Sequence, residues 1–218
     1  MAARRLRVVV SAGPTREPLD RVRFLTSAST GRMGFAVAEA CRRAGHEVVL
    51  VAGPTDLPPP RGVKVVRVTT ALEMRAAVLA AFRRADALVM TAAVSDYRPA
   101  RPRRGKWKKG PARLSLPLVR NPDILAEAAR RKGRRLCVGF AVEVEDALPN
   151  ARAKLRRKSL DALCLCGPAA FGADAADYRV LLPDGTVRSL PGVSKSALAR
   201  WIAGFVARRV QVESAFTR

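Results

Sequence analysis

Residues 6–52 read LRVVVSAGPTREPLDRVRFLTSASTGRMGFAVAEACRRAGHEVVLVA. An unbroken apolar run at residues 6–10 is followed by a long polar loop, a segment with helical spacing at 33–44 and a second apolar run at 47–52. Apolar runs that do not alternate with polar residues are typical of strands buried on both faces, as in a parallel sheet. The stretch therefore predicts a strand, a crossover helix and a parallel strand.

The same order of elements recurs along the rest of the chain. Further strand-like runs lie at residues 63–68, 87–91, 136–140 and 162–166, with helical patterns between them at 72–83, 123–131 and 147–158. Strands that alternate with helices are typical of a sheet covered by helices on both faces. The sequence therefore predicts an α/β fold with a doubly wound, mostly parallel sheet.

Capping residues mark where two of these helices begin. Thr70 and Glu73 have the spacing of a capping box. Asn121 is expected to cap the next helix, with Pro122 in the first helical position and Asp123 adding a carboxylate to the first turn.

A hairpin and a last helix are predicted near the C-terminus. Residues 178–182 and 186–190 are strand-like and flank Pro-Asp-Gly, which favours a turn. Ser194 is expected to cap a final amphipathic helix that ends near residue 208.

Length and composition indicate one folded domain. The chain has 218 residues, of which 49% are apolar and 27% charged, as in folded proteins. With no internal repeat and no long linker, residues 1–210 are expected to form a single domain and residues 211–218 a tail that frays. No apolar run approaches the roughly 18 residues that span a bilayer, and no cleavable apolar segment opens the chain. We therefore predict a cytoplasmic protein without a membrane partner.

The cysteines and the single histidine offer little to a metal ion. Cys41, Cys137, Cys164 and Cys166 lie in or beside apolar segments and lack the spacing of a zinc site or a disulfide framework. His46 follows a glycine at the start of a strand. We therefore expect reduced thiols in the core and no metal ligands from the protein.

The net charge predicts an anionic partner. Lys and Arg number 41 against 18 Asp and Glu, a net charge of +23, which suits nucleic acid, a membrane surface or a phosphorylated small molecule. Aromatic residues are only 5% and no nucleic-acid-binding signature is present, so nucleic acid is not the expected partner. The densest basic segment, RPRRGKWKK at residues 101–109, is broken by Pro and Gly and is predicted to be a mobile loop.

In open parallel sheets, ligands bind beyond the carboxyl ends of the strands. The first loop there, residues 11–32, brings hydroxyls and two glycines to the start of a helix, where free amides and the helix dipole can bind phosphate. The spacing fits neither the dinucleotide fingerprint nor a P-loop, and the glycines could also serve only as turn formers.

Three later loops also carry residues suited to an anionic ligand. Asp96 could bind a ribose hydroxyl, help to hold a metal ion or lie in an exposed turn. Residues 121–124 form a second capped helix start. Lys154 and Lys158 share one helix face, where like charges repel by roughly a few tenths of a kcal/mol. Facing one polyanion would offset that repulsion; otherwise both lysines face solvent.

Several ordered blocks resemble the phosphopantothenoylcysteine synthetase family, including the synthetase half of the bacterial bifunctional protein. The blocks are AGPTREPLD at 12–20, VRF at 22–24, STGRMG at 29–34, AAVSDYR at 92–98, KWKK at 106–109, NPDI at 121–124, VGFA at 138–141 and KLRRK at 154–158. The resemblance covers nearly the whole chain and implies a Rossmann-like fold with a basic flap and a C-terminal hairpin plus helix.

The resemblance implies a ligase. The family activates the carboxylate of 4'-phosphopantothenate with CTP in most bacteria, or ATP in animals, and releases pyrophosphate. The amine of L-cysteine then attacks the acyl nucleotide, giving phosphopantothenoylcysteine and CMP or AMP. Mg2+ is the implied cofactor, bridging triphosphate oxygens.

The resemblance also implies roles for individual residues. Catalytic positions map to Lys106, Arg23, Ser27 and Ala92, with Lys106 on the mobile flap. Nucleotide-binding positions map to Gly13, Ser29, Gly31, Gly34, Met90, Thr91, Ala92, Asp96, Lys106, Asn121, Pro122, Asp123, Ile124, Phe140, Lys154 and Lys158. Substrate-binding positions map to Arg23, Ser27 and Cys166.

The chain departs from the family pattern at a few of these positions. Ser27 and Cys166 stand where the family usually has Asn, Gly167 replaces an acidic residue, and Pro14 replaces a second glycine of the first loop. A Ser hydroxyl lacks the amide donor pair, and Pro14 has no N–H. These departures affect the residues for phosphopantothenate binding and acyl transfer more than those for nucleotide binding.

Family properties imply partners as well. The family is dimeric, with a strand expected here at residues 114–119 helping to join the subunits. Bacterial bifunctional members carry a flavin-dependent decarboxylase half before this domain, so we expect this chain to lack that activity and a separate decarboxylase to act next.

Two alternative functions remain open. One is a divergent nucleotide-dependent ligase of the same fold that acts on another carboxylate. The other is a non-enzymatic basic module that binds nucleic acid or other polyanions.

Overall fold

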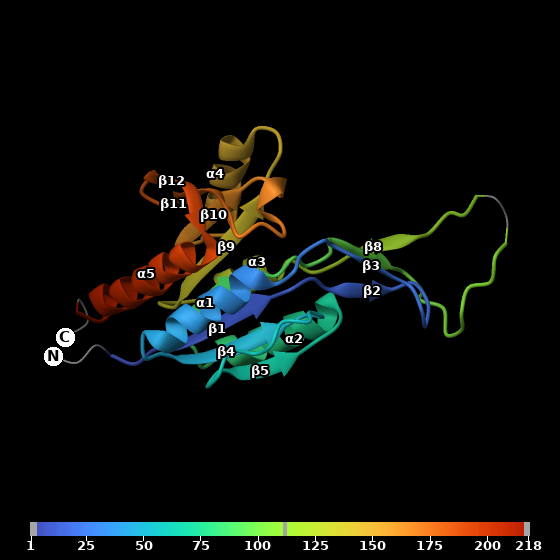
Figure 1. Ribbon diagram of the computed structural model, residues 1–218, viewed down its shortest axis with the longest axis horizontal. Helices are drawn as coiled ribbons and strands as arrows, with labels where there is room; N and C mark the ends of the chain where they lie inside the picture. The colour runs from blue at the N-terminus through green and yellow to red at the C-terminus, as the bar shows by residue number, and fades with distance from the viewer. Residues whose placement is uncertain (1–3, 111–112, 216–218) are drawn as a thin grey trace.

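A single large sheet organises the molecule. The computed structural model describes residues 4–110 and 113–215 (Figure 1). Within this part an eight-stranded sheet has the order β12-β11-β10-β9-β6-β1-β4-β5. The strands are β1 (Arg7–Ala12), β4 (Glu47–Ala52), β5 (Lys64–Arg67), β6 (Ala87–Met90), β9 (Leu136–Val142), β10 (Ala162–Cys166), β11 (Ala175–Leu181) and β12 (Val187–Ser194). The strands from β10 to β5 are parallel, and only β11 and β12 pair antiparallel, so the predicted α/β fold is confirmed.

Helices cover both faces of the sheet. On one face lie α1 (Arg32–Arg43) and α5 (Lys195–Ala215), and on the other lie α2 (Ala71–Phe82), α3 (Ile124–Arg130) and α4 (Ala147–Arg157). Successive side chains of a strand point to opposite faces. Val8 and Val10 of β1 accordingly pack under α1 and α5, whereas Val9 packs under α2 and α3. This two-sided burial explains the unbroken apolar runs of the sequence.

The order of the strands reverses at β1. From β1 the chain proceeds to β4 and β5 on one side and returns to β6, β9 and β10 on the other. The loops after β1 and β6 therefore leave the sheet in different directions and open a crevice at the carboxyl edge. A Cβ at Gly34 would lie 2.4 Å from the Ala12 Cβ and 2.5 Å from the Thr91 Oγ1, so glycine lets α1 pack closely beside this crevice.

An arm extends from the body of the molecule (Figure 1). It consists of two antiparallel pairs, β2 (Arg16–Pro18) with β3 (Phe24–Thr26) and β7 (Tyr97–Pro99) with β8 (Leu118–Arg120), and of the basic loop, residues 100–117, that joins β7 to β8. The strand expected at 114–119 is therefore shorter and later. Its pairing ends at the bond from Ala100 N to Pro117 O, because the facing segment turns away at a Pro- and Gly-containing stretch.

The helix starts bear out one capping prediction and correct another. Thr70 and Glu73 form the predicted capping box of α2. Asn121, however, does not cap α3. Asp123 does so by accepting a hydrogen bond from Ala126 N at 3.0 Å, and Pro122 precedes the helix. Asn121 is buried and its side chain is used elsewhere, since it donates to Ser95 O and accepts from Arg98.

The C-terminal elements follow the prediction with one difference. β11 and β12 form the expected hairpin, and Ser194 Oγ accepts a bond from Ala197 N at 3.2 Å at the start of α5. α5 continues to Ala215 instead of ending near 208, so most of the predicted tail is helical and residues 216–218 lie outside the described part. Among the helices of the described residues, none combines the length and the apolar character needed to cross a membrane.

Candidate nucleotide and substrate site

The two ends of the first loop meet at the start of α1. Gly13 has φ 77 and Gly31 has φ 82, both in the left-handed region that favours glycine. A Cβ at Gly31 would lie 3.2 Å from Gly13 N, so a side chain there would crowd the neighbouring loop. The structure thus brings together Gly13, Gly31 and Gly34, three positions to which the resemblance assigns nucleotide binding.

Among the described residues, the start of α1 has free backbone amides and no capping side chain. Gly31 occupies the N-cap position, so no side chain caps the helix, and its first turn holds no acidic residue. In the described part of the chain, the amides of Met33 and Gly34 have no acceptor. The hydroxyl of Ser29 accepts from Gly31 N at 3.3 Å. Free amides and the positive end of the helix dipole attract a negative group to this point.

A small pocket of about 70 Å3 adjoins this helix start. Its lining includes Gly31, Thr91, Phe140 and Cys166, so predicted residues from four separate segments meet here. Cys166 is buried, and burial raises the pKa of its thiol to about 11, which keeps the thiol neutral. The pocket therefore combines apolar walls with the charged start of α1.

Two cations that the sequence analysis missed close this pocket. Arg32 donates to Gly172 O at 3.1 Å and pairs with Asp174 at 2.8 Å. Lys195 donates to Ala170 O at 3.0 Å, and partial burial followed by the nearby Arg32 charge lowers its pKa. The position of Lys195 could have been predicted from the sequence. The two strands of the hairpin first return the chain to the amino edge of the sheet and then bring it back to the carboxyl edge, so the helix that follows, α5, begins there with Lys195.

A wider groove of about 510 Å3 lies on the other side of the helix start. It runs between β3 and residues 54–57, and Ser27 lies in its wall. Ser29, Thr30 and Arg32 line both the groove and the pocket. The helix start thus separates two hollows that share a wall.

The loop after β6 is tied to the loop after β1. Thr91 Oγ1 donates to Ser11 O at 2.6 Å, and Ala92 N donates to Ser11 Oγ at 3.1 Å. Thr15 is fully buried and accepts a bond from Ser95 N at 3.1 Å. These bonds place Ala92 beside the crevice. Met90, in contrast, is buried in the core beneath α2 and α3, so its side chain lies outside the crevice.

A second group of predicted residues lies on the α3 and α4 side of the sheet. Lys158 Nζ lies 2.8 Å from Asp123 Oδ2, and Lys154 Nζ lies 2.5 Å from Glu143 Oε1. Burial alone would raise the pKa of Asp123, but bonds from Lys158 and from a backbone amide lower it overall. Both lysines thus have carboxylate partners that an anionic ligand would have to replace. The carboxylate of Asp96 is exposed and has no hydrogen bond within the described structure.

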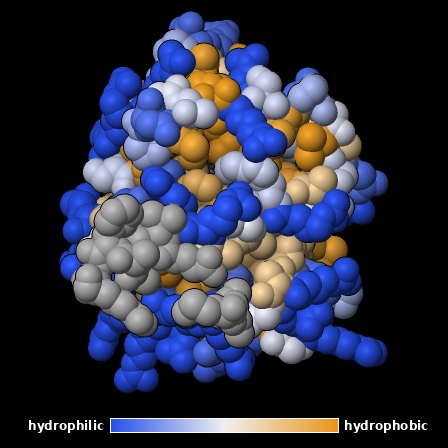
Figure 2. All heavy atoms as spheres, turned by 90° about the vertical axis from the view of Figure 1, so that its left-hand side faces the viewer, coloured by the Kyte–Doolittle hydropathy of each residue, from blue (hydrophilic) through white to orange (hydrophobic). Residues whose placement is uncertain are grey.

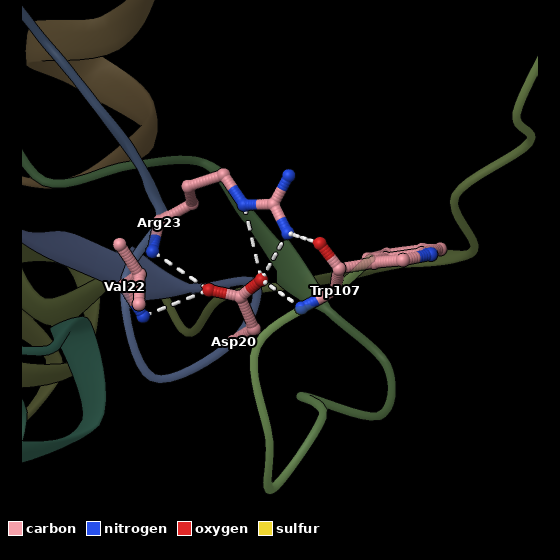
Figure 3. Close-up of polar contacts among 4 residues, drawn as sticks. All are labelled: Asp20, Val22, Arg23 and Trp107. Carbon is pink, nitrogen blue, oxygen red and sulfur yellow. Dashed lines mark hydrogen bonds and ion pairs between the residues drawn. The ribbon is translucent and has the colours of Figure 1, made fainter. Parts of the chain in front are cut away.

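Lys106 and Arg23 lie on the arm, apart from both groups. Lys106 is exposed in the basic loop. The guanidinium of Arg23 contacts Asp20, with Nε at 3.0 Å and Nη2 at 2.5 Å from Oδ2, and Nη2 also donates to Trp107 O at 2.6 Å (Figure 3). Asp20 and Trp107 lie in two of the blocks that carry the family resemblance, but sequence reasoning gave neither a role, because their contact joins residues far apart in the chain.

Comparisons with known proteins agree with this architecture. The family model described as the DNA/pantothenate metabolism flavoprotein C-terminal domain matches residues 3–210. The Coenzyme A biosynthesis bifunctional protein CoaBC of Bacillus subtilis strain 168 is 42% identical over 193 residues, which are 86% of this chain and 48% of that protein. The protein of the same name from Escherichia coli K12 is 47% identical over 163 residues, 73% of this chain and 40% of that protein. The chain thus spans about half the length of these relatives, or less.

Solved structures show the same fold. The crystal structure of the C-terminal domain of a Coenzyme A biosynthesis bifunctional protein CoaBC superimposes with a TM-score of 0.83 and 35% identity, covering 95% of this chain and 96% of that one. A Cab2 mutant in complex with phosphopantothenate-cysteine superimposes with a TM-score of 0.80 over 97% of this chain and 88% of its own, at 16% identity. At that identity the second likeness concerns the fold alone.

Proposed function

The chain belongs to the DNA/pantothenate metabolism flavoprotein C-terminal domain family, and from this premise we propose that it is a phosphopantothenate–cysteine ligase of coenzyme A biosynthesis. Its substrates are 4'-phosphopantothenate, L-cysteine and a nucleoside triphosphate. The observation that carries the proposal is the uncapped start of α1 between a pocket and a groove at the carboxyl edge. A phosphate group bound at this helix start would lie between the pocket and the groove. The reaction joins two anionic substrates, so each hollow could hold one of them.

The first step joins these two anions. A carboxylate oxygen of phosphopantothenate attacks the α-phosphorus of the nucleotide, the bond to the β-phosphate oxygen breaks, and pyrophosphate leaves with the electron pair. Because the reactants repel each other, the protein contributes mainly cations, amides and alignment. The amides of Met33 and Gly34 hold phosphate oxygens, and Lys154 and Lys158 exchange their carboxylate partners for oxygens of the nucleotide.

The second step transfers the acyl group. The cysteine nitrogen attacks the acyl carbon, the carbon–oxygen bond to the nucleotide phosphate breaks, and the nitrogen loses a proton as CMP or AMP leaves. Lys106 neutralises the charge that develops on the phosphate. Ser27, in the wall of the groove, supplies a hydroxyl where the family has an amide, and Cys166 lines the substrate pocket. By the family resemblance, Ala92 beside the crevice and Arg23 on the arm also act in acyl transfer.

We propose CTP as the nucleotide and Mg2+ as its counterion. In the described part of the chain no three His, Cys, Asp or Glu side chains cluster as a metal site. A Mg2+ ion carried on triphosphate oxygens needs few protein ligands, and the exposed carboxylate of Asp96, in the loop after β6, fits that demand. When bound, the ion supplies positive charge to the triphosphate. The proposal of CTP rests on the family resemblance of the sequence, since most bacterial members of that family use CTP.

We further propose a dimer joined through the arm. Most of the large apolar side chains that the described structure exposes lie on the arm, namely Val22, Phe24, Tyr97, Leu114, Leu118 and Val119. The opposite end of the molecule is mostly hydrophilic, with apolar areas scattered between (Figure 2). Large apolar side chains that are exposed together on one part of a folded protein favour an interaction site there. A separate decarboxylase partner and a cytoplasmic location stay predictions.

Pyrophosphate release tests the proposed function. The purified protein is incubated with Mg2+, 4'-phosphopantothenate and either CTP or ATP, with and without L-cysteine, and the product mass is measured. Cysteine-dependent phosphopantothenoylcysteine supports the ligase and identifies the nucleotide. Pyrophosphate without that product would indicate another acceptor, as for a divergent ligase. No pyrophosphate from folded protein would overturn the proposal and favour the basic binding module.

A further inference from the structure

A buried carboxylate that has been given no role so far, Asp20, holds the basic loop against the β2–β3 hairpin of the arm. The Asp20 side chain is 0% exposed. Its Oδ1 accepts from Val22 N and Arg23 N, both at 2.8 Å, and its Oδ2 accepts from Arg23 and from Trp107 N at 2.8 Å (Figure 3). The bond from Arg23, with those from the amides, holds the pKa of Asp20 well below its usual range. A shielded anion with this many donors is a built feature and not a solvated surface charge.

Both backbone polar atoms of Trp107 are paired by side chains. Asp20 accepts from its N–H, and Arg23 donates to its carbonyl at 2.6 Å. The Arg103 guanidinium lies over the Trp107 ring, 4.2 Å from its centroid, and Arg103 N donates to Leu19 O at 3.0 Å. Asp20, Arg23 and Trp107, here called the loop anchor, therefore join the loop to the β2–β3 hairpin.

The anchor divides the loop into a held part and a free part. Residues 103–107 are fixed at both ends, at Arg103 and at Trp107. Residues 108–110 and 113–116 form no hydrogen bond within the described structure. Lys106 directly precedes Trp107, and consecutive Cα atoms are about 3.8 Å apart. The proposed catalytic lysine thus sits on the held part of the loop.

We infer that Asp20 is a positioning residue for the ligation reaction: through the loop anchor it fixes the backbone beside Lys106 and so sets where the lysine ammonium is presented. The inference rests on the proposed function for its kinetic consequence only. Asparagine cannot replace Asp20 in this role, because its side chain has an NH2 group in place of one carboxylate oxygen, and that donor would face the N–H groups that now donate to Asp20. A misplacement of about 1 Å near reacting groups can cost roughly a hundredfold in rate.

The fluorescence of Trp107 tests the anchor without reference to activity. The chain has 2 Trp residues, and Trp201 stacks on Phe205 in α5, so Trp201→Phe leaves Trp107 as the only indole. In that background Asp20→Asn is expected to increase acrylamide quenching of Trp107 and lower its anisotropy. The matched control is Asp184→Asn, at a turn where Asp184 accepts from Thr186 N, and it should change neither.

Turnover then shows whether the anchor acts through the lysine. Lys106→Ala is expected to abolish nearly all product formation with the fold intact, and Asp20→Asn to lower turnover by roughly a hundredfold. In a Lys106→Ala background, Asp20→Asn should cost nothing more, since a positioning residue has nothing left to position. If Asp20 had a purely structural role, Asp20→Asn would lower turnover by the same factor in the wild-type and the Lys106→Ala backgrounds.

A second pair of variants covers the case in which Asp20→Asn does not fold. Trp107→Pro removes the N–H that Asp20 accepts, and Trp107→Phe keeps it, so a larger loss of turnover in Trp107→Pro supports the inference. Unchanged quenching in Asp20→Asn, equal losses in both lysine backgrounds, or equal turnover of the two Trp107 variants would each overturn it. If the wild-type protein makes no product, the proposed function is refuted and not the loop anchor. The quenching experiment still tests whether Asp20 holds Trp107 in place.

Discussion

At the scale of single residues, several buried polar groups show what the fold demands of them. His46 is 6% exposed; its Nδ1 accepts a bond from Leu6 N at 3.5 Å, and its Nε2 has no partner. Burial lowers the pKa of His46 from its ordinary 6.5, and the charge of Asp86 opposes that change only in part. The imidazole is therefore kept neutral in the folded protein.

This state of His46 predicts acid sensitivity. Above about pH 6.5 the imidazole is neutral whether the chain is folded or not, so it contributes no pH dependence. Below that value the unfolded chain binds a proton that the folded chain does not, and the free energy of unfolding falls as the pH falls. Denaturant unfolding between about pH 7 and about pH 5 should show a smaller decrease in His46→Asn than in the wild type. Parallel slopes for the two proteins would contradict the assignment.

Single residues also show where prediction from sequence stops. Asn121 and Asp123 are both good capping residues, and only the tertiary contacts of Asn121 with Ser95 and Arg98 decide between them. Asp20 stands in a block that carries the family resemblance, but its role could not be predicted because its partner Trp107 is 87 positions away. Gly13, Gly31 and Gly34 were grouped by the family resemblance, but the structure gives them different reasons: Gly13 and Gly31 have positive φ, whereas Gly34 lets α1 pack closely on the sheet.

At the scale of elements, the packing of α1 on the sheet depends on one missing side chain. A Cβ at Gly34 would lie 2.4 Å from the Ala12 Cβ and 2.8 Å from Ser11 O, and the backbone oxygen cannot move away cheaply. Gly34→Ala should therefore destabilise the protein by about 1–3 kcal/mol, measured by urea unfolding. It should also weaken nucleotide binding by tilting the start of α1.

Gly204→Ala is the matched control for this substitution. Gly204 also lies in a helix, but a Cβ there would meet only the end of the Arg208 side chain, at 3.1 Å. Alanine is the better helix former, so we expect a gain of about 0.5–1 kcal/mol. A loss at Gly204 as large as that at Gly34 would mean that helix propensity, and not close packing, explains the glycine in α1.

The α4 helix presents its two lysines toward different partners. Lys154 pairs with Glu143 and Lys158 with Asp123, so removing one ammonium leaves the other ion pair in place. Lys154→Ala should raise the KM for the nucleotide at least tenfold, because charge-assisted contacts to phosphate are lost, with a smaller effect on kcat. Arg152→Ala, on an exposed position of the same helix, should leave both constants unchanged. Equal effects of the two variants would point to general electrostatics of the basic surface.

Elements were predicted unevenly from the sequence. The parallel strands and their helices are encoded locally, in apolar runs and helical spacing, and the structure confirms them. The short strands of the arm, β2, β3, β7 and β8, have three residues each and no apolar pattern of their own. β2 and β3 pair across a short turn, and β7 and β8 pair across the basic loop, so runs this short give local patterns little to reveal. Of the four, only β8 was anticipated, as a longer strand at 114–119, and that expectation came from the family resemblance.

At the scale of the whole molecule, the arm decides the proposed assembly. Leu118 and Val119 are 45% and 38% exposed on β8 at an edge that no strand covers in the described structure. Leu118→Asp should convert a dimer to a monomer in sedimentation velocity, because a charge would be buried unpaired in the interface. Leu72→Asp, at an exposed position of α2, is the control and should remain dimeric. A wild-type monomer at all concentrations would refute the proposed dimer.

The first strand and the last helix lie at the same end of the molecule, which matters for experiments that attach the protein by a chain end. β1 begins at the amino edge of the sheet, and α5 starts at the carboxyl edge and runs back, so the first strand and the last helix meet at the end of the molecule away from the arm (Figure 1). A chip surface, a fluorescent reporter or an affinity handle attached at either end would therefore face away from the crevice. Immobilised protein should keep its binding face open to solution.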